Sequence, residues 1–405
     1  MLKPSEALRQ ILESVTPLAE QELVALEHCV GRVLAREVVS DLDLPPFDKS
    51  AMDGFAVHAE DFSAELAPGG ERTLPIVGEA RAGAPFRAAV PRGTCAAIYT
   101  GAELPPECDA VVIVEHSSPA GEACVTLRDR PRSGQNICNR GMDLSQGARV
   151  LARGQRIRAV DLALLAAVGC EPAAVVRRPR IAIWTSGDEL VAPSARPGLG
   201  QIREGNTLHL AALTRAAGCE VVERGVVRDD ERELEQTFAR ALERCDALLT
   251  TGGVSMGKYD LVGAALERVG VRGLFHKVAI KPGKPLWFGV RGPKCVFALP
   301  GNPVSCLVNH DAFVAPALRK LGGETPCSAA PRSGRWGGAA REANPREQYL
   351  PVTVRFGADG VALLEPVRWN GSADVVGISK CRALAVAPAE RELRPGDVLE
   401  WRELF

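Results

Sequence analysis

Apolar and polar positions follow different periods along this chain, and the changes of period predict separate domains. Between Leu8 and Val15 the apolar residues recur at helical spacing, which predicts an amphipathic helix behind Pro4, with its first turn capped by the Ser5 hydroxyl. From Leu74 to about residue 130 the sequence consists of short segments rich in β-branched residues, separated by Gly and Pro. This pattern is typical of a small β domain.

From Arg180 onward strands and helices are expected to alternate. "RIAIW", "EVVERGVV" and "DALLTTGG" read as strands, whereas "NTLHLAALTRAAG", "DERELEQTFARALERC" and "DLVGAALERVG" read as helices. Such alternation predicts right-handed β-α-β units and a mostly parallel sheet that is covered on both faces. Ligands of these sheets bind beyond the carboxyl ends of the strands, so the functional site is expected there.

The remaining segments set the domain boundaries that we predict. A helix over residues 159–168, stopped by Gly169, is expected to pair with the N-terminal segment, which makes the β domain an insertion. After a linker rich in Gly, Ser and Pro, the last 60 or so residues read as short strands. The fold class is therefore multidomain α/β, with these parts: an N-terminal helical and linker domain, 1–45 plus 141–173; an inserted β domain, 46–140; an α/β domain, 174–325; a C-terminal β domain, 326–405.

Length and composition indicate a globular protein of several domains. A chain of 405 residues is too long for one ordinary core, and 46% hydrophobic with 24% charged residues is typical of a globular protein. No run of about 18 uncharged apolar residues could span a bilayer. The first residues carry Glu6, Arg9 and Glu13 inside the helical pattern, unlike a secretory signal, which predicts a cytoplasmic protein. A net charge of -1 argues against a nucleic-acid surface spread over the whole molecule.

Cysteine and histidine do not predict a metal site. The twelve cysteines are scattered without a C-x-x-C pair, and most lie in apolar strings, so we expect reduced and buried thiols. The six histidines are equally dispersed and include no H-E-x-x-H spacing.

Three glycine loops carry the candidate chemistry: "TSGDEL" from Thr185, "TTGGVSMGKYD" from Thr250 and "LPGNPVS" from Leu299. Each follows a predicted strand and runs towards a helix, where backbone N–H groups can approach a phosphate. A tight turn also needs glycine for steric reasons alone, but three such loops are expected at one sheet edge. Neither a P-loop nor a dinucleotide fingerprint is present. The candidate binding residues are Ser186, Gly187, Gly252, Gly253, Ser255, Gly257, Pro300, Gly301, Asn302 and Ser305.

Lysines and carboxylates extend this candidate site. In "HKVAIKPGKP", an extended backbone would place Lys277 and Lys281 on the same side, where they could bind a multiply charged anion together with Lys284. The alternative is a solvated edge strand whose lysines prevent pairing with another strand. Carboxylates beside a phosphate site usually imply Mg²⁺ between the two. Those expected at the same rim are Asp188, Glu189, Asp229, Asp230 and Asp260; the alternative for Asp188 and Asp230 is that they are isolated surface acids.

Taken in order with "FDKSAMDGFAV", "YTGAELP" and "SGQNICNRGMD", these loops and "KPGKP" resemble the MoeA family over nearly the whole chain. The family comprises molybdopterin molybdenumtransferases and includes the E domain of gephyrin. The resemblance implies a MogA-like central domain, a small barrel-like C-terminal domain and an elongated homodimer with its active site at the interface. It also implies an enzyme of molybdenum cofactor biosynthesis that inserts molybdate into adenylylated molybdopterin and releases AMP with the help of Mg²⁺.

Roles carry over from the resemblance residue by residue. It implies that Asp53, Thr100 and Asp143 enter the cleft from the second domain or second subunit. Glu189, Asp229 and Asp260 match functional acids, with Asp260 as the Mg²⁺ contact, and Lys277 and Lys281 match essential lysines. Ser372, in "WNGSAD", matches a serine of the C-terminal domain.

Two positions depart from the family pattern. Lys49 stands where the motif "FDNSAMDG" usually has asparagine, and this adds a cation beside the motif. Pro351 stands where the C-terminal domain usually has an arginine. Proline cannot pair with phosphate, so that contact is absent or comes from Arg346 or Arg355.

Two other functions remain open at this point. The central domain also resembles the adenylyltransferase that activates molybdopterin with ATP, although the long terminal additions favour metal insertion. A non-catalytic scaffold that binds molybdopterin or a peptide, as the gephyrin E domain does, is the second alternative; clustered charges disfavour it. The expected partners are small-molecule substrates and a second copy of the chain, with transient contacts to an adenylyltransferase and to molybdoenzyme acceptors, and neither nucleic acid nor membrane.

Overall fold

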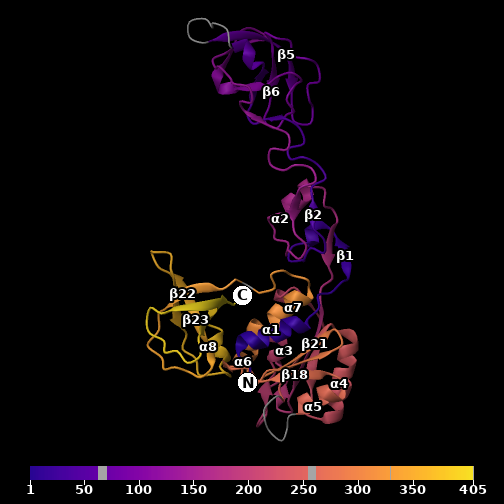
Figure 1. Ribbon diagram of the computed structural model, residues 1–405, viewed down its shortest axis with the longest axis vertical. Coiled ribbons are helices and arrows are strands. Elements are labelled where there is room, and N and C mark those ends of the chain that lie inside the picture. The colour runs from indigo at the N-terminus through magenta and orange to yellow at the C-terminus, as the bar shows by residue number, and fades with distance from the viewer. Residues whose placement is uncertain (63–70, 254–260, 329, 405) are drawn as a thin grey trace. The chain divides into compact units, whose positions relative to one another are not determined.

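The computed structural model describes residues 1–62, 71–253, 261–328 and 330–404. The chain forms two compact units (Figure 1). The first contains residues 1–36, 153–162 and 172–405, and the second contains residues 37–152 and 163–171. None of the helices in these described ranges is long and apolar enough to cross a membrane.

A six-stranded sheet forms the centre of the first unit, in the order β16-β13-β17-β21-β20-β18. The first four strands are parallel, while β20 and β18 run antiparallel at one edge, which confirms the mostly parallel sheet predicted from the sequence. Every residue of β17 is buried, as expected for a strand covered on both faces. The bounds are β13, Arg180–Ser186; β16, Glu220–Val227; β17, Ala247–Thr251; β18, Arg272–His276; β20, Trp287–Arg291; β21, Lys294–Leu299.

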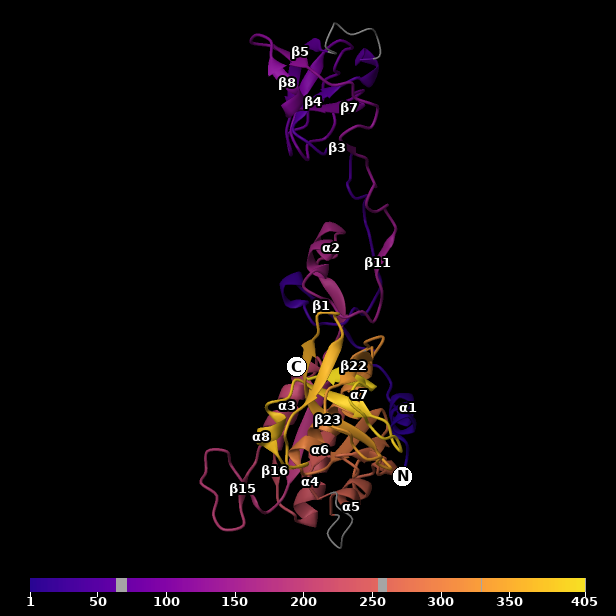
Figure 2. The same ribbon diagram turned by 90° about the vertical axis from the view of Figure 1, so that its left-hand side faces the viewer.

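Helices cover both faces of this sheet. On one face, α4 (Glu231–Arg244) and α5 (Leu261–Arg268) bury Phe238 and Leu266 against the strands. On the other, an apolar core joins α3 (Asn206–Ala216), α6 (Pro303–Asn309) and α7 (Ala315–Leu321), with a π-helical turn at His310–Val314 between the last two. Figure 2 shows that the loop carrying β15 (Ile202–Arg203), which pairs with β14 (Leu190–Val191), projects from this domain.

The N-terminal helix α1 (Pro4–Ser14) packs on the second of these faces, beside α7. Ala7 and Ile11 are fully buried in the same core, and the Lys320 Nζ donates to the Leu12 carbonyl at 2.6 Å. The amphipathic helix was therefore predicted correctly, but the hydroxyl cap was not. Lys3 is the cap residue, and its backbone N–H donates to the Glu6 carboxylate at 3.1 Å, because the helix begins at Pro4, two residues earlier than a Ser5 cap requires.

The C-terminal domain, also in the first unit, is a closed ring of five strands. The pairings run β23-β24-β22-β26-β25 and return from β25 to β23, so no edge is left within the ring. Trp336, Leu364 and Trp401 fill its centre. The short β19 (Ile280–Lys281) of the α/β domain adds to β23 in parallel. The other bounds are β22, Arg332–Trp336; β23, Glu347–Phe356; β24, Ala362–Pro366; α8, Val375–Ile378; β25, Ala383–Ala387; β26, Val398–Glu403.

The second unit is built on a six-stranded sheet in the order β7-β4-β6-β5-β9-β8. Two short ladders, β3-β10 and β2-β11, join chain segments about 90 to 110 residues apart, so the sheet lies between paired strands as an insertion does. The bounds are β2, Val38–Val39; β3, Lys49–Ser50; β4, Gly54–Val57; β5, Arg72–Ala80; β6, Cys95–Ile98; β7, Ala110–Ile113; β8, Ser117–Pro119; β9, Cys124–Leu127; β10, Ile137–Cys138; β11, Arg149–Leu151.

A few short elements complete the chain. In the first unit β1 pairs antiparallel with β12. The helix expected over residues 159–168 forms as α2 and ends before Gly169, whose φ of 72° lies in the left-handed region. The bounds are β1, Gln21–Val24; α2, Asp161–Ala167; β12, Ala173–Val176; and three 3₁₀ turns, Leu26–His28, Ala59–Phe62 and Val114–His116.

All twelve cysteines are free thiols, but only seven are buried as predicted; Cys124, Cys138, Cys170, Cys327 and Cys381 are partly exposed. Burial raises the pKa of Cys295 and Cys306 to about 12, so both stay protonated at neutral pH. Among the described residues, no group of three or more His, Cys, Asp or Glu side chains could hold a metal ion.

Candidate functional site

A pocket of about 1210 Å³ opens at the carboxyl ends of β13, β17 and β21, where the sequence placed the site. It lies wholly within the first unit. Described residues from each of the three glycine loops meet there, and two of the predicted acids are beside them. The predicted residues that line the pocket are Ser186, Gly187, Glu189, Asp229, Gly252, Gly253, Pro300, Gly301 and Asn302.

Close contact between loops explains why the second loop needs glycine. Gly252 has a φ of 89°, and a Cβ added there would lie 2.2 Å from the Ser186 carbonyl oxygen. A side chain would therefore separate the β17 loop from the β13 loop. Glycine is therefore required at position 252 for steric reasons, and its small size also keeps the backbones of the two loops together at the pocket wall.

Two hydroxyls at the end of β13 have no hydrogen-bond partner among the residues that the structure describes. Thr185 and Ser186 are each 3% exposed and line the pocket, yet neither Oγ makes a hydrogen bond to any residue that the structure describes. Buried polar groups are nearly always hydrogen-bonded, because an unpaired one costs about 1–3 kcal/mol. These hydroxyls are therefore suited to bind a polar ligand.

The first loop does not run straight into a helix as expected. After Glu189 the chain enters β14 and β15 and reaches α3 only at Asn206. The Glu204 carboxylate, just before this helix, accepts from the Thr207 backbone N–H at 2.7 Å and from its hydroxyl at 2.8 Å. These bonds fix the start of α3 at the pocket.

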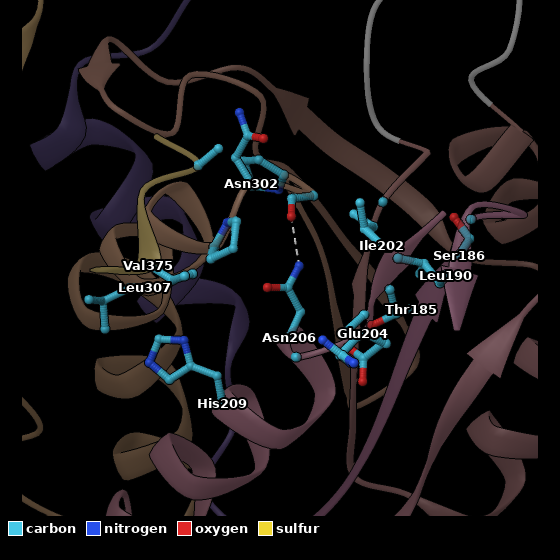
Figure 3. A pocket seen from close by; sticks show the side chains of 18 of the residues that line it. Thr185, Ser186, Leu190, Ile202, Glu204, Asn206, His209, Asn302, Leu307 and Val375 are labelled. Atoms are coloured by element: carbon cyan, nitrogen blue, oxygen red, sulfur yellow. Dashed lines mark hydrogen bonds between the residues drawn. The ribbon is translucent and has the colours of Figure 1, made fainter. Parts of the chain in front are cut away.

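Asn206 is a pocket residue that sequence reasoning missed. Its Nδ2 donates to the Gly301 carbonyl at 2.7 Å, the bond drawn in Figure 3, while the Thr251 hydroxyl donates to the Pro300 carbonyl at 2.8 Å. The first bond holds the third loop against α3, and the other holds it against the second loop. Asn206, His209 and Leu213 line the pocket at spacings of three and four along α3, a periodicity that could have revealed this face of the helix.

The C-terminal domain supplies another wall of the pocket. Val375 and Ile378 of α8 line it, although Ser372 itself does not. The Ser372 hydroxyl accepts from the Asn302 Nδ2 at 2.8 Å, and its carbonyl accepts from the Val304 N–H at 3.0 Å. Ser372 therefore holds the third loop in place from the C-terminal side.

The predicted lysines do not line this pocket. The strand β18 ends at His276, and Lys277 has a φ of 84°, so the backbone is not extended at this point. The prediction that Lys277 and Lys281 face the same side depended on an extended backbone and has therefore lost its basis. Lys281 and Lys284 are exposed, while Pro285, the next residue, does line the pocket. Ser305 is buried in α6 outside the pocket lining.

The side chain of Asn309 anchors this lysine segment. Asn309 is fully buried, and its Nδ2 donates to the Gly283 carbonyl at 3.0 Å and to the Ser305 carbonyl at 2.9 Å. Of the two arginines considered as replacements at Pro351, Arg346 donates to the Ile280 carbonyl at 3.2 Å, next to Lys281. Arg355 instead pairs with Glu365 at 3.0 Å.

The carboxylates at the rim separate into two roles. Glu189 and Asp229 face the pocket, and the Asp229 N–H donates to the Asp188 carboxylate at 3.4 Å, which brings the two loops together. Asp230 instead caps α4, because its carboxylate accepts from the N–H groups of Arg232 and Glu233 at 3.0 Å each. The predicted residues Ser255, Gly257 and Asp260 lie outside the described residues.

The remaining predicted residues lie on the second unit. The Asp53 carboxylate accepts from both the N–H and the hydroxyl of Thr100 at 2.7 Å, and these bonds lower the pKa of Asp53. The structure thus joins two of the predicted residues directly. Lys49 lies in β3, paired with Cys138 of β10, and Asp143 is exposed in the loop before β11.

Comparisons with known proteins agree with this architecture. Residues 2–169 match the family described as the MoeA N-terminal region (domain I and II), and residues 182–320 match a probable molybdopterin binding domain. A solved structure of the molybdopterin biosynthesis moeA protein from Pyrococcus horikoshii OT3 superimposes with a TM-score of 0.85 at 28% identity and covers 100% of both chains.

Curated relatives extend the match at the level of sequence. The chain is 36% identical to the molybdopterin molybdenumtransferase of Haemophilus influenzae over 80% of this chain and 78% of that protein. It is 39% identical to the protein of that name from Synechococcus elongatus, over 78% and 80%, and 32% identical to that of Bacillus subtilis, over 95% and 89%. The chain therefore belongs to the MoeA family of molybdopterin molybdenumtransferases.

Proposed function

We propose that this enzyme of molybdenum cofactor biosynthesis binds adenylylated molybdopterin in the pocket of the α/β domain, inserts molybdate and releases AMP. The observation that carries the proposal is the convergence of described residues from three glycine loops on the hydroxyls of Thr185 and Ser186, which have no hydrogen-bond partner within the described ranges. Such a group of hydroxyls and loop backbones suits the phosphates of a nucleotide-linked substrate. Family membership supports the same reaction.

Positive charge is needed because both substrates are anions. We assign this task to Lys277, Lys281 and Lys284, with Arg346 beside them from the C-terminal domain. Their charges would offset the repulsion between molybdate and the substrate phosphate before the dithiolene sulfurs replace oxygens on molybdenum. Lys281 ends the short strand β19, and Lys284 follows the turn that Asn309 anchors, so the backbone at both lysines loses little freedom when the anions bind.

Magnesium fits the residues present. Mg²⁺ usually takes one or two protein carboxylates and completes its shell with water and substrate phosphate oxygens. Glu189 and Asp229 provide two carboxylates in the pocket, and family resemblance adds Asp260. When bound, the ion would reduce the negative charge of the phosphoanhydride and polarise it.

We further propose a cytoplasmic homodimer in which Asp53, Thr100 and Asp143 of one copy complete the site of the other. The support is that these residues belong to a separate compact unit and that the twelve free thiols suit a reducing compartment. Mixing an Asp53→Ala chain with a Glu189→Ala chain tests the shared site, because only mixed dimers then contain one intact site. Recovery of activity on mixing supports sharing, and a monomeric mass in solution contradicts it.

The reaction itself is tested with purified protein, adenylylated molybdopterin, Mg²⁺ and molybdate. Molybdate-dependent release of AMP is the expected result, and its absence would reject metal insertion. Release of pyrophosphate from ATP would indicate the adenylyltransferase instead, an alternative disfavoured by the match of residues 2–169 to the MoeA N-terminal region. Binding of molybdopterin without turnover would indicate the scaffold.

A further inference from the structure

The pocket has a second part that the proposed phosphate chemistry does not use. Figure 3 shows His209, Leu307 and Val375 together on the far side of Asn206 from Ser186. We call this part the apolar arm and define it by five lining residues: His209, Leu213, Leu307, Val375 and Ile378. They come from α3, α6 and α8, so the arm lies between the α/β domain and the C-terminal ring of the same unit.

One polar side chain stands among these apolar walls. The His209 ring makes no hydrogen bond to any group in the described part of the chain and faces the pocket. Burial lowers the pKa of His209, and beside it burial lowers the pKa of His310 to about 3, so both rings are neutral at pH 7. A neutral imidazole offers one donor and one acceptor nitrogen. The arm therefore presents apolar side chains and a single adaptable hydrogen-bonding group.

We propose that the apolar arm binds the adenine ring of the substrate, with His209 as the group that recognises its edge, an assignment that rests on the proposed function. Adenylylated molybdopterin carries two ring systems, and they differ in polarity. The pterin has a lactam, an amino group and further ring N–H groups, which would lose several hydrogen bonds among hydrocarbon walls. Adenine has fewer such groups and two apolar faces, which Leu307 and Val375 can cover.

Connectivity supports this orientation. Adenine is joined through ribose to the α-phosphate, so a ring in the apolar arm directs the phosphates past Asn206 towards the glycine loops. There the hydroxyls of Thr185 and Ser186 make no hydrogen bond to the described part of the chain. The apolar arm thus binds the adenine end of the adenylate, and the glycine loops bind its phosphate end.

The test compares AMP with ribose 5-phosphate, which lacks the base, by isothermal titration calorimetry on the full-length protein. We expect AMP to bind more tightly than ribose 5-phosphate to the unaltered protein. His209→Ala should weaken AMP binding about five- to tenfold, the equivalent of one lost hydrogen bond, and leave ribose 5-phosphate unchanged. Val375→Trp should remove the preference, because Val375 is 53% exposed and a larger side chain can fill the arm without entering the core.

Leu208→Ala is the matched control. Leu208 precedes His209 on α3, is 46% exposed and does not line the pocket, so its loss should alter neither affinity. Equal binding of the two ligands by the unaltered protein would overturn the proposal, as would an AMP preference that survives both variants. Loss of 6-hydroxymethylpterin binding in Val375→Trp, with AMP binding retained, would assign the arm to the pterin.

The inference and the function on which it rests fail in different ways. Without molybdate-dependent AMP release by the unaltered protein, the proposed function fails whatever the calorimetry shows. With that release intact and the AMP preference unaffected by either variant, only the assignment of the arm fails.

Discussion

Replacing Asn309 by alanine tests how the lysine segment is held beside the site. The change removes two hydrogen bonds donated to the carbonyls of Gly283 and Ser305, at 3.0 and 2.9 Å. Each is worth about 1 kcal/mol net, and the buried Gly283 carbonyl, left without its partner, adds about 1–2 kcal/mol. We expect Asn309→Ala to lower the free energy of unfolding of the α/β domain by about 3 kcal/mol, measured by urea denaturation.

The same change should alter how the enzyme uses molybdate. Gly283 lies between Lys281 and Lys284, so a loosened turn leaves both ammonium groups less well positioned for an anion. The molybdate concentration for half-maximal AMP release should rise several-fold, with a smaller effect on the maximal rate. Asn370→Ala is the matched control, because the Asn370 side chain is exposed on the C-terminal domain and its loss should change neither quantity.

A double-mutant cycle sharpens this test. Gly283 has a φ of 106°, and a Cβ placed there would lie 2.4 Å from the Asn309 Nδ2. Gly283→Ala should therefore destabilise the protein on its own, and less so when the Asn309 amide is already removed. Additivity of the two changes to within about 0.5 kcal/mol would refute the contact, as would an unchanged stability in Asn309→Ala.

Three further predictions concern single contacts. Asp230→Ala should cost about 1 kcal/mol of stability in a urea titration, without a change in AMP release, because Asp230 caps α4 at its N-terminus. Thr100→Val should raise the pKa of Asp53 towards its ordinary value, and an NMR titration of the Asp53 carboxyl would measure this change. In the unaltered protein, the lowered pKa of Asp53 stabilises the fold at a pH above the unfolded-state pKa. This stability is lost as the pH falls through the folded-state pKa. Arg156→Ala should destabilise the first unit by about 2–4 kcal/mol in urea, because Arg156 forms hydrogen bonds to both carboxylate oxygens of Glu324, at 3.2 and 2.6 Å; unchanged unfolding in Arg156→Ala would contradict it.

The sheet and the meeting of the glycine loops were predictable from the sequence. Strands buried on both faces give nearly continuous apolar runs, as in "DALLTT", and these runs are easy to separate from amphipathic helices such as α4. Because carboxyl ends of parallel strands share one edge, loops after Ser186, Thr251 and Leu299 had to come together. No contact between specific side chains was needed for this step.

The far side of the pocket could not be predicted in the same way. The helix α3 was expected, but which of its faces would meet another domain depends on packing across more than 160 residues of sequence, between His209 and Val375. The turn at Lys277 was missed for a related reason. Its positive φ is held by tertiary contacts, such as the hydrogen bond from the Leu2 N–H to the Lys277 carbonyl, and no glycine marks it in the sequence.

Ser372 shows how a residue singled out by resemblance can act without contacting the substrate. Its hydroxyl and carbonyl are both occupied by the third loop, through Asn302 and Val304, and it stands outside the pocket lining. Two hydrogen bonds from one residue fix both the position and the tilt of the C-terminal segment against that loop. Asp374, two residues on, caps α8 through the Gly377 N–H at 2.9 Å and so directs Val375 towards the pocket. The serine thus sets the distance between the glycine loops and the apolar arm, which a single substrate spanning both would require.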